Sequence, residues 1–387
     1  MEQVKRLAIA EVRFARLVSI GDVIMGGGRR PVVQSMTNTS TSDVERTLAQ
    51  IRSAAVAGAQ VMRVAVPDKQ AVAALPAIVA GSPVPIVADI HFDYRLALAA
   101  IEAGVHKLRI NPGNIGSRSR VKDVVYAAQE HGTAIRVGVN AGSLEPRLLK
   151  RYGGPCPEAL VDSAMDNARL VEAMGFKDIV LSLKGSDVPS TVEAYRRVAG
   201  CCDYPLHIGI TEAGTRWTGA IRSAVGLGVL LAMGIGDTLR VSLASDPVDE
   251  VHAAYRILEA LGIERRGPTV IACPTCGRTR IDVIGLADAV EKALGIRTEP
   301  LTVAVMGCVV NGPGEAREAD IGVAGGDGEG LLFRCGKPLR KVPENEIVEA
   351  LVALFDEVVS ESRRESRERK RSGNECNDKD TECYPSE

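Results

Sequence analysis

The chain has 387 residues, enough for two domains, one of which can be as large as an α/β barrel. Hydrophobic residues make up 45% of it and charged residues 25%, which is ordinary for a soluble globular protein. The formal net charge of −2 excludes a strong overall attraction to nucleic acid or to anionic membranes. Aromatic residues amount to only 3%, so an extensive base-stacking surface is not expected.

No apolar run reaches the roughly 18 residues that a membrane span needs, and the first residues lack the apolar stretch of a secretory signal. The number of cysteines is nine, an odd number, which fits a reducing compartment better than a framework of disulfides. We therefore expect a cytoplasmic protein that does not enter a membrane.

One local pattern recurs along the first two-thirds of the chain. A helical stretch rich in Ala, Leu and Val ends at a glycine, and a short β-branched strand follows. The glycines are Gly58, Gly104, Gly132, Gly175 and Gly234. A glycine just past a helix end adopts the left-handed conformation that caps the helix. The helix before the first of these glycines is predicted to open with a capping box formed by Ser42 and Glu45.

Eight strands are predicted along this pattern, over residues 31–37, 61–66, 85–91, 107–113, 134–140, 178–184, 205–211 and 238–244. Strands that alternate with helices form parallel βαβ units, and eight of them in about 250 residues match the size of a closed (β/α)8 TIM barrel. An open doubly wound sheet is the alternative. It usually carries fewer strands and a G-x-G-x-x-G turn that opens a helix, which this chain lacks. We predict an α/β TIM barrel over residues 1–262.

Polar residues gather near the ends of the predicted strands, at spacings that place them on one side of each strand. They are Arg63, Asp89, His91, Arg109, Asn111, Arg136, Asn140, Ser182, Lys184, Arg240 and Ser242, with Glu212 following the seventh strand. Two such residues on one strand, taken singly, are explained equally well as surface residues or as partners in inter-strand ion pairs. Taken together they mark the carboxyl ends of the strands, where barrels form their active-site mouth. Because four arginines and a lysine outnumber two acids, the mouth predicts a small, highly anionic substrate such as a diphosphate.

After residue 262 the pattern changes to a predicted α+β domain over residues 263–359. Strands are expected near 268–273, 301–306, 320–324 and 330–335, with helices near 280–294 and 344–359. The first two strands deliver Cys273 and Cys276, which form a C-x2-C loop, and Cys308. These are the only cysteines at metal-ligand spacing.

Three thiolates from these loops can hold one metal centre, and Glu315 offers a harder oxygen ligand where a fourth cysteine is absent. An iron–sulfur cluster held in this way would leave one iron open to a substrate. Structural zinc is the alternative. It would need Cys335 as its fourth ligand, since no histidine lies beyond position 252.

Residues 360–387 are highly charged and nearly free of large apolar side chains, so we predict a disordered tail or a frayed extension of the closing helix. The basic run at 363–371 leaves a second functional class open, in which a zinc-stabilised module and this tail bind nucleic acid beside a catalytically idle barrel. A solvated tail of mixed charge is the favoured interpretation, without nucleic acid as a partner.

Five segments of the chain resemble the 4-hydroxy-3-methylbut-2-en-1-yl diphosphate synthase family, the iron–sulfur enzymes of the methylerythritol phosphate route to isoprenoids. They are 34–38 (QSMTN), 87–92 (VADIHF), 108–114 (LRINPGN), 206–214 (LHIGITEAG) and 307–315 (GCVVNGPGE). The resemblance covers about residues 5–359 and is to the shorter bacterial form, because no extra domain separates the barrel from the cysteine loops.

The resemblance implies a [4Fe–4S] cluster held by Cys273, Cys276, Cys308 and Glu315. It also implies a head-to-tail homodimer in which the cluster domain of one chain caps the barrel of the other. The substrate would be 2-C-methyl-D-erythritol 2,4-cyclodiphosphate. Two electrons from flavodoxin or ferredoxin would open and dehydrate it to 4-hydroxy-3-methylbut-2-en-1-yl diphosphate.

In that reaction the arginines of the mouth, with Lys184 and Ser242, are expected to hold the diphosphate and neutralise its charge. Glu212 is the candidate that donates the proton with which the oxygen leaves as water. Asp89 and His91 are expected to orient the substrate or to help to move protons.

Overall fold

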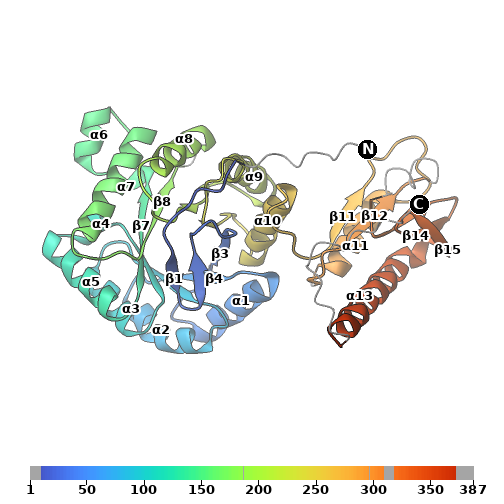
Figure 1. Cartoon of the computed structure of the whole chain (residues 1–387), viewed down its shortest axis with the longest axis horizontal. Helices are drawn as coiled ribbons and strands as arrows, with labels where there is room; N and C mark the ends of the chain where they lie inside the picture. Colours follow the sequence, from blue (N-terminus) through green and yellow to red (C-terminus); the bar gives the residue numbers. More distant parts are fainter. Residues whose placement is uncertain (1–9, 186, 296, 309–317, 372–387) are drawn as a thin grey trace. The chain divides into compact units, whose positions relative to one another are not determined.

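The computed structural model describes residues 10–371 with the exception of 186, 296 and 309–317. They belong to two compact units, which divide between Arg265 and Arg266 (Figure 1). Among the described helices, none is both long and apolar enough to cross a membrane.

The first unit is a barrel of eight parallel strands, as predicted. The strands follow one another in the order β8-β7-β6-β5-β4-β3-β10-β9, and a parallel bridge between Leu181 and Leu206 links the two ends of this series. Their bounds are β3 Val32–Met36, β4 Val61–Ala65, β5 Ile86–Asp89, β6 Lys107–Ile110, β7 Ala134–Asn140, β8 Ile179–Lys184, β9 His207–Ile208 and β10 Thr238–Leu239. The eight predicted strands therefore all exist.

All of these strands except β7 are shorter than predicted, and β5, β6, β9 and β10 are shorter by three residues or more. β6 ends at Ile110 because Asn111 accepts a hydrogen bond from the backbone N–H of Gly113 at 3.1 Å and caps the short helix α4 (Pro112–Ile115). β9 and β10 keep regular pairing over two residues each. At β9 the reason is local, since Pro205 cannot donate a ladder hydrogen bond and Gly209 adds no side chain to pack.

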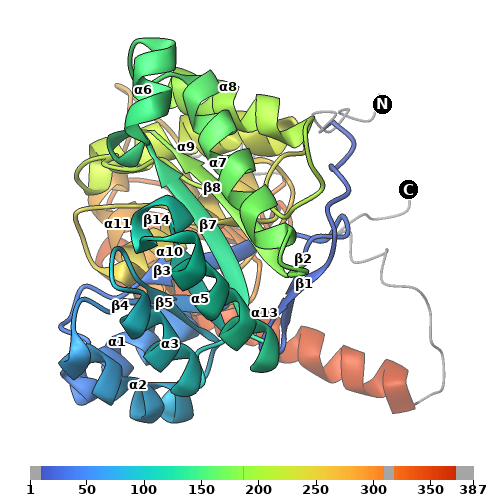
Figure 2. The same ribbon diagram turned by 90° about the vertical axis from the view of Figure 1, so that its left-hand side faces the viewer.

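Helices surround the strands, and Figure 2 shows α5 and α7 in front of β7 and β8. The remaining bounds are α1 Val44–Ala57, α2 Lys69–Gly81, α3 Tyr94–Glu102, α5 Arg118–Glu130, α6 Pro146–Tyr152, α7 Pro157–Glu172, α8 Val188–Ala199, α9 Arg216–Ala232 and α10 Pro247–Ala260. All five glycines predicted to follow helix ends have a positive φ. The predicted capping box is wrong: Asp43 caps α1 by accepting from the backbone N–H of Arg46 at 3.1 Å, while the Ser42 hydroxyl bonds to Ser40.

The barrel interior is apolar at one end and polar at the other. A hairpin of β1 (Val18–Ile20) and β2 (Val23–Met25) precedes the barrel. Its buried side chains cluster with the first inward-facing residues of several barrel strands, namely Val32, Val61, Val87, Ala134 and Val180. The hairpin therefore closes the amino-terminal end. Two positions further along the same strands, the inward-facing residues are polar or charged, because side chains alternate with a period of two.

The second unit is a five-stranded sheet in the order β11-β12-β13-β14-β15, of which the first three strands are parallel. Its elements are β11 Thr269–Ala272, α11 Val283–Leu294, β12 Thr302–Met306, β13 Ile321–Gly325, β14 Glu329–Arg334, β15 Lys337–Pro343 and α13 Ile347–Arg371. α11 and α13 share an apolar core with the strands. β15 was not predicted, because this exposed edge strand buries only Val342 and so lacks a regular apolar pattern. α13 continues to Arg371, well past the helix end expected near 359.

Candidate active site

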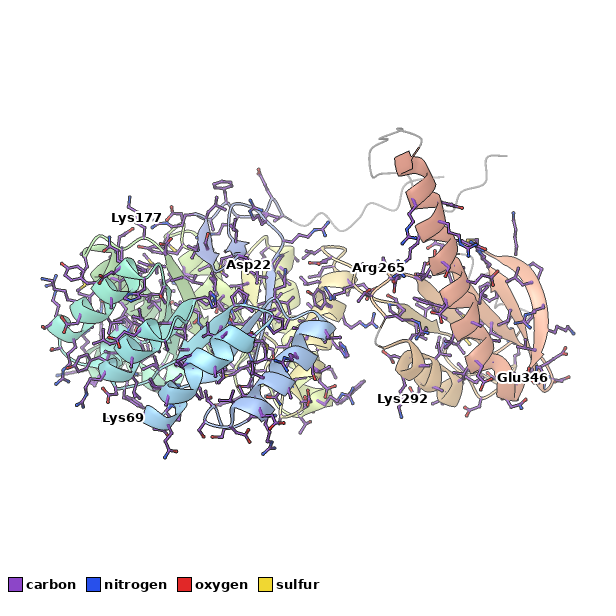
Figure 3. All side chains as sticks on the ribbon, turned by 90° about the horizontal axis from the view of Figure 1, so that it is seen from below. Asp22, Lys69, Lys177, Arg265, Lys292 and Glu346 are labelled. Atoms are coloured by element: carbon purple, nitrogen blue, oxygen red, sulfur yellow. The ribbon has the colours of Figure 1, made fainter. Side chains whose placement is uncertain are left out.

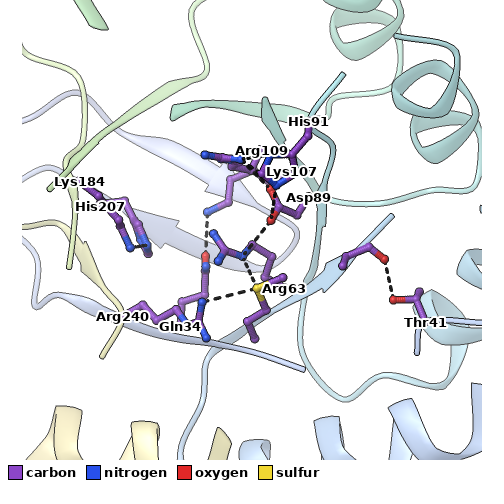
Figure 4. A network of polar contacts seen from close by, with 12 residues as sticks. Gln34, Thr41, Arg63, Asp89, His91, Lys107, Arg109, Lys184, His207 and Arg240 are labelled. Atoms are coloured by element: carbon purple, nitrogen blue, oxygen red, sulfur yellow. Dashed lines mark hydrogen bonds and ion pairs between the residues drawn. The ribbon is translucent and has the colours of Figure 1, made fainter. Parts of the chain in front are cut away.

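Asp89, at the end of β5, is the acidic centre of the mouth. Its carboxylate lies 3.8 Å from Arg63 Nε, 3.3 Å from Arg109 Nη1 and 3.6 Å from His91 Nε2 (Figure 4). Burial alone would raise the pKa of Asp89. Arg63, the neighbouring His91 and Arg109 outweigh that effect and hold the pKa well below its usual range. The ionised carboxylate thus gathers three of the predicted site residues around itself.

Arg109 extends this group toward β7. Its Nη1 lies 3.3 Å from His91 Nε2, and its Nη2 donates at 3.1 Å to the Asn140 amide oxygen when that amide is oriented to satisfy its neighbours. A Cβ on Gly138 would lie 2.6 Å from Arg109 Nε and 3.2 Å from Ser182 Oγ. The glycine therefore creates the space in which the guanidinium and the hydroxyl lie.

Arg240 follows β10 and is fixed by a carboxylate from outside the predicted set. Its Nε and Nη2 donate to Glu250 of α10 at 3.0 and 2.9 Å. Glu250 also accepts from Ser35 Oγ at 2.7 Å and from the backbone N–H of Leu243 at 3.0 Å. This two-point ion pair aims a guanidinium of fixed orientation into the barrel.

A second group of cations lies deeper in the barrel. Lys107 of β6 is fully buried and donates to Gln34 Oε1 at 3.4 Å, and Lys184 Nζ lies 3.4 Å from His207 Nε2 (Figure 4). Arg136 of β7 is 1% exposed, and its Nε and Nη1 have no hydrogen-bond partner among the described residues. Burial, followed by the nearby arginines, lowers the pKa of both lysines and of His207 well below their ordinary values.

The interior carries more positive than negative charge. In the described part of the barrel, the carboxylates that contact these cations are Asp89 and Glu250. The basic side chains are Arg63, Lys107, Arg109, Arg136, Lys184 and Arg240, and the four arginines alone outnumber the two carboxylates. Burial lowers the pKa of Arg63 to about 10, against the opposing effect of Asp89. Buried donors without acceptors and cations without counter-ions are costly, so the arrangement suits a small polyanion.

The other predicted residues of the mouth differ in how deeply they are buried. Ser182 and Asn111 are buried, and Asn111 Nδ2 has no hydrogen-bond partner among the described residues, whereas Ser242 is half-buried just after β10. Glu212 is exposed in the loop after β9, and no described contact joins it to the Asp89 group. Its φ of 51° lies in the left-handed region that glutamate rarely adopts. Such strain is found at functional sites more often than elsewhere.

The cysteines lie at the carboxyl ends of two adjacent strands of the second unit. Cys273 directly follows β11 and Cys308 follows β12 by two residues, and Ala272 of β11 is in register with Val305 of β12. The backbone N–H of Gly307 donates to Cys273 Sγ at 3.2 Å, which joins the two loops.

Cys276 lies in the exposed part of the C-x2-C loop, and the backbone N–H of Arg278 lowers the pKa of its thiol. Glu315 lies outside the described residues. Within those residues, no three His, Cys, Asp or Glu side chains are close enough together to hold a metal ion.

Both units match models of one protein family. Residues 15–255 match the GcpE TIM-barrel domain, and residues 269–357 match the GcpE protein C-terminal domain. The chain belongs to the GcpE family. A relative from Geobacter sulfurreducens named 4-hydroxy-3-methylbut-2-en-1-yl diphosphate synthase (flavodoxin) is 57% identical over 346 residues, 89% of this chain and 98% of the relative. One of the same name from Brevibacillus brevis is 54% identical, over 89% of this chain and 96% of the relative. The predicted family is confirmed, and it favours an enzyme over the nucleic-acid-binding alternative.

The GcpE C-terminal unit also excludes the zinc site that would use Cys335. The backbone N–H of Cys335 donates to the carbonyl of Asp320 at 2.9 Å, just before β13. Because β13 runs parallel to β12, this position is at the amino end of the strand, whereas Cys273 and Cys308 lie at the carboxyl ends. A strand of five residues spans roughly 16 Å, which is far beyond the reach of one metal ion.

Four polar residues of the GcpE barrel were not among the predicted site residues: Gln34, Lys107, His207 and Glu250. For Lys107 and His207 the sequence did contain a signal, because they precede Arg109 and Gly209 by two positions and so face the interior with them. Gln34 lies at the equivalent position of β3. Glu250 had no such signal, since only the packing of α10 against β3 and β10 brings it to Arg240.

Proposed function

We propose that this chain reduces 2-C-methyl-D-erythritol 2,4-cyclodiphosphate to 4-hydroxy-3-methylbut-2-en-1-yl diphosphate, with two electrons supplied by flavodoxin, the donor given in the names of its relatives. The observation that carries the proposal is the excess of buried positive charge in the barrel. Arg136 in particular holds two buried N–H groups that lack an acceptor among the described residues. The diphosphate of this substrate supplies the anion that those donors need.

Cys273, Cys276, Cys308 and Glu315 are the proposed ligands of a [4Fe–4S] cluster. The donor set fits, because three cysteine sulfurs suit an iron–sulfur site and the lowered pKa of the Cys276 thiol favours its thiolate. When bound, the cluster supplies the electrons and a Lewis acid for the departing oxygen.

The residues of the barrel bind and orient the substrate. Arg63, Arg109 and Arg240 would contact phosphate oxygens from the mouth, and Arg136 and Lys184 from below. The hydrogen-bonding groups of Asn111, Asn140, Ser182 and Ser242 complete the binding set. Asp89 holds Arg63, Arg109 and His91 in place, so its contribution to the reaction is positioning.

Glu212 is the proposed proton donor. It is exposed next to the mouth and is not engaged by the Asp89 group, so it is available to protonate the leaving oxygen. The φ of 51° fixes the direction in which its side chain leaves the backbone.

The further parts of the proposal concern assembly and surroundings. We infer a head-to-tail homodimer in the cytoplasm, in which the cluster domain of one chain covers the barrel of its partner. An oxidising compartment would attack the thiols on which the cluster depends.

The proposal is tested by anaerobic turnover of the cyclodiphosphate with reduced flavodoxin, following the alkene diphosphate by chromatography. Iron and sulfide are expected at about four each per chain, the stoichiometry of a [4Fe–4S] centre. Protein with a full cluster and no product, under conditions that support a relative's turnover, would contradict the proposed reaction. Sedimentation of the same sample tests the dimer separately.

A further inference from the structure

Lys107 occupies an unusual position, at the boundary between the apolar floor and the charged layer of the barrel. Its register partners on the neighbouring strands are Val87 of β5 and Ala134 of β7, and both belong to the apolar cluster that packs on the β1–β2 hairpin. The side chain is 0% exposed. Neither water nor the floor can therefore solvate an ammonium group at this position.

The groups around Lys107 do not compensate its charge. In the described part of the chain its Nζ has one hydrogen bond, to Gln34 Oε1 at 3.4 Å, and no carboxylate within ion-pair distance. The interior groups of the surrounding strands are Arg63 of β4, Asp89 of β5, Arg109 of β6, Arg136 of β7, Lys184 of β8, His207 of β9 and Arg240 after β10. Asp89 is already paired with Arg63 and Arg109, and the hairpin contributes only Val18, Ile20 and Met25.

Several buried hydrogen-bond donors of the described barrel interior also lack acceptors. Gln34 directs its Oε1 toward Lys107, while its buried Nε2 has no partner among the described residues. Arg136 Nε and Nη1 also lack a partner among the described residues, and after burial Arg136 has the largest effect on the pKa of Lys107. Three buried donors without acceptors next to an uncompensated amine define a place for an anion.

We propose that Lys107 is a proton-coupled binding residue, which is neutral in the empty barrel and takes up one proton from solvent when the diphosphate enters. The proposal rests on the proposed function, because it takes the cyclodiphosphate as the anion. The cyclic diphosphate carries one strongly acidic group on each phosphorus, so it stays doubly charged near neutrality and exchanges no proton itself. The proton gained on binding therefore resides on the protein.

The direction of the pH dependence follows from this assignment. Burial and the neighbouring Arg136 and Arg63 lower the pKa of Lys107 in the empty barrel, and two negative charges beside it raise that pKa again. Uptake occurs at pH values between the two pKa values. Within this window the affinity for substrate rises as the pH falls, by about tenfold per pH unit for one proton. Below the lower pKa the amine is already charged, and the affinity no longer changes.

Calorimetric titration of the oxidised, cluster-loaded protein with the cyclodiphosphate measures the uptake, because the heat in HEPES and in Tris differs by the protons exchanged with the buffer. The wild type is expected to take up about one proton at some pH between about 7 and 9. Lys107→Met should lower the uptake by about one proton and weaken binding roughly ten- to a hundred-fold. Lys177→Met, on the outer surface (Figure 3), is the matched control and should bind and take up protons like the wild type.

A second variant keeps the test decisive if Lys107→Met does not fold. Gln34→Glu places a carboxylate beside the amine, so Lys107 is charged before the substrate arrives and the uptake should fall by about one proton although the lysine is present. Binding by the wild type without uptake over this pH range, or full uptake in either variant, would overturn the proposal. No binding of the cyclodiphosphate to the wild type would instead contradict the proposed function.

Discussion

The barrel mouth and the cysteine loops both lie at the carboxyl ends of parallel strands, yet they are held in different ways. In the barrel, Asp89 and Glu250 fix the guanidinium groups through ion pairs that are formed without any ligand. In the second unit, Cys276 is exposed, and the hydrogen bonds between the two loops come from backbone N–H groups, such as that of Gly307 to Cys273 Sγ. The fold itself completes the anion site, whereas the group bound by the thiolates must complete the other.

Replacing a cysteine tests the site in the second unit, which depends on its bound group, and has the largest expected effect. Cys273→Ser, Cys276→Ser and Cys308→Ser should each lose the visible absorbance of the cluster and all turnover, because hydroxyl oxygen is a poor ligand for iron. Iron content, absorbance and activity are the measurements. Since the barrel site does not depend on the cluster, each variant should still be stabilised against heat by the cyclodiphosphate. A full cluster in all three variants would remove these residues from the ligand set.

Glu212→Gln has the next largest expected effect, and it distinguishes a role in the chemical step from a role in substrate binding. Turnover should fall about a hundred- to ten-thousand-fold, as is usual when a general acid is lost, with substrate affinity and iron content unchanged. Single-turnover kinetics and calorimetry measure the two quantities. Normal turnover would pass the role of proton donor to His91 or to water.

Glu212→Gly is a companion variant, because glycine adopts the observed φ of 51° without strain. It should be as inactive as Glu212→Gln and unfold at equal or higher denaturant concentration. A stability gain of up to about 1 kcal/mol is the expected size.

Arg136→Ala and Arg109→Ala test the anion site in the barrel, which the fold assembles without a bound group. Each removes a charge-assisted contact worth about 1.5–3 kcal/mol, so the affinity for substrate should fall roughly ten- to a hundred-fold. The cluster spectrum should remain that of the wild type. Unchanged binding in both variants would be incompatible with a diphosphate site in this barrel.

Glu250→Gln has the smallest expected effect on the reaction, because Glu250 acts on the substrate only through Arg240. The amide keeps the shape of the carboxylate but not its charge, so the guanidinium is held less firmly. We expect KM to rise by less than about tenfold with kcat nearly constant, and a loss of about 1–3 kcal/mol in the free energy of unfolding. Urea denaturation and steady-state kinetics measure both. A fall in kcat alone would indicate that Glu250 acts in the chemistry.

Local sequence patterns predicted most of the barrel and the part of the site carried by its strands. Glycine caps and β-branched strands have short-range causes, and a period of two is enough to bring Arg109 and Asp89 to one mouth. The pairing of Glu250 with Arg240 depends on how α10 packs, which no local pattern contains. The predicted N-cap of α1 was wrong because both Ser42 and Asp43 can cap a helix. Only the conformation of the surrounding loop decides between them, and local sequence does not determine it.

The hairpin of β1 and β2 has a kinetic consequence. Because Val18, Ile20 and Met25 fill the amino-terminal end of the barrel, we expect substrate to enter and product to leave by the opposite, polar end. The product must leave by the route along which the next substrate enters, and it still carries a diphosphate that the same arginines attract. Accumulated product should therefore compete with substrate, and the rate of product release sets an upper limit on the turnover rate.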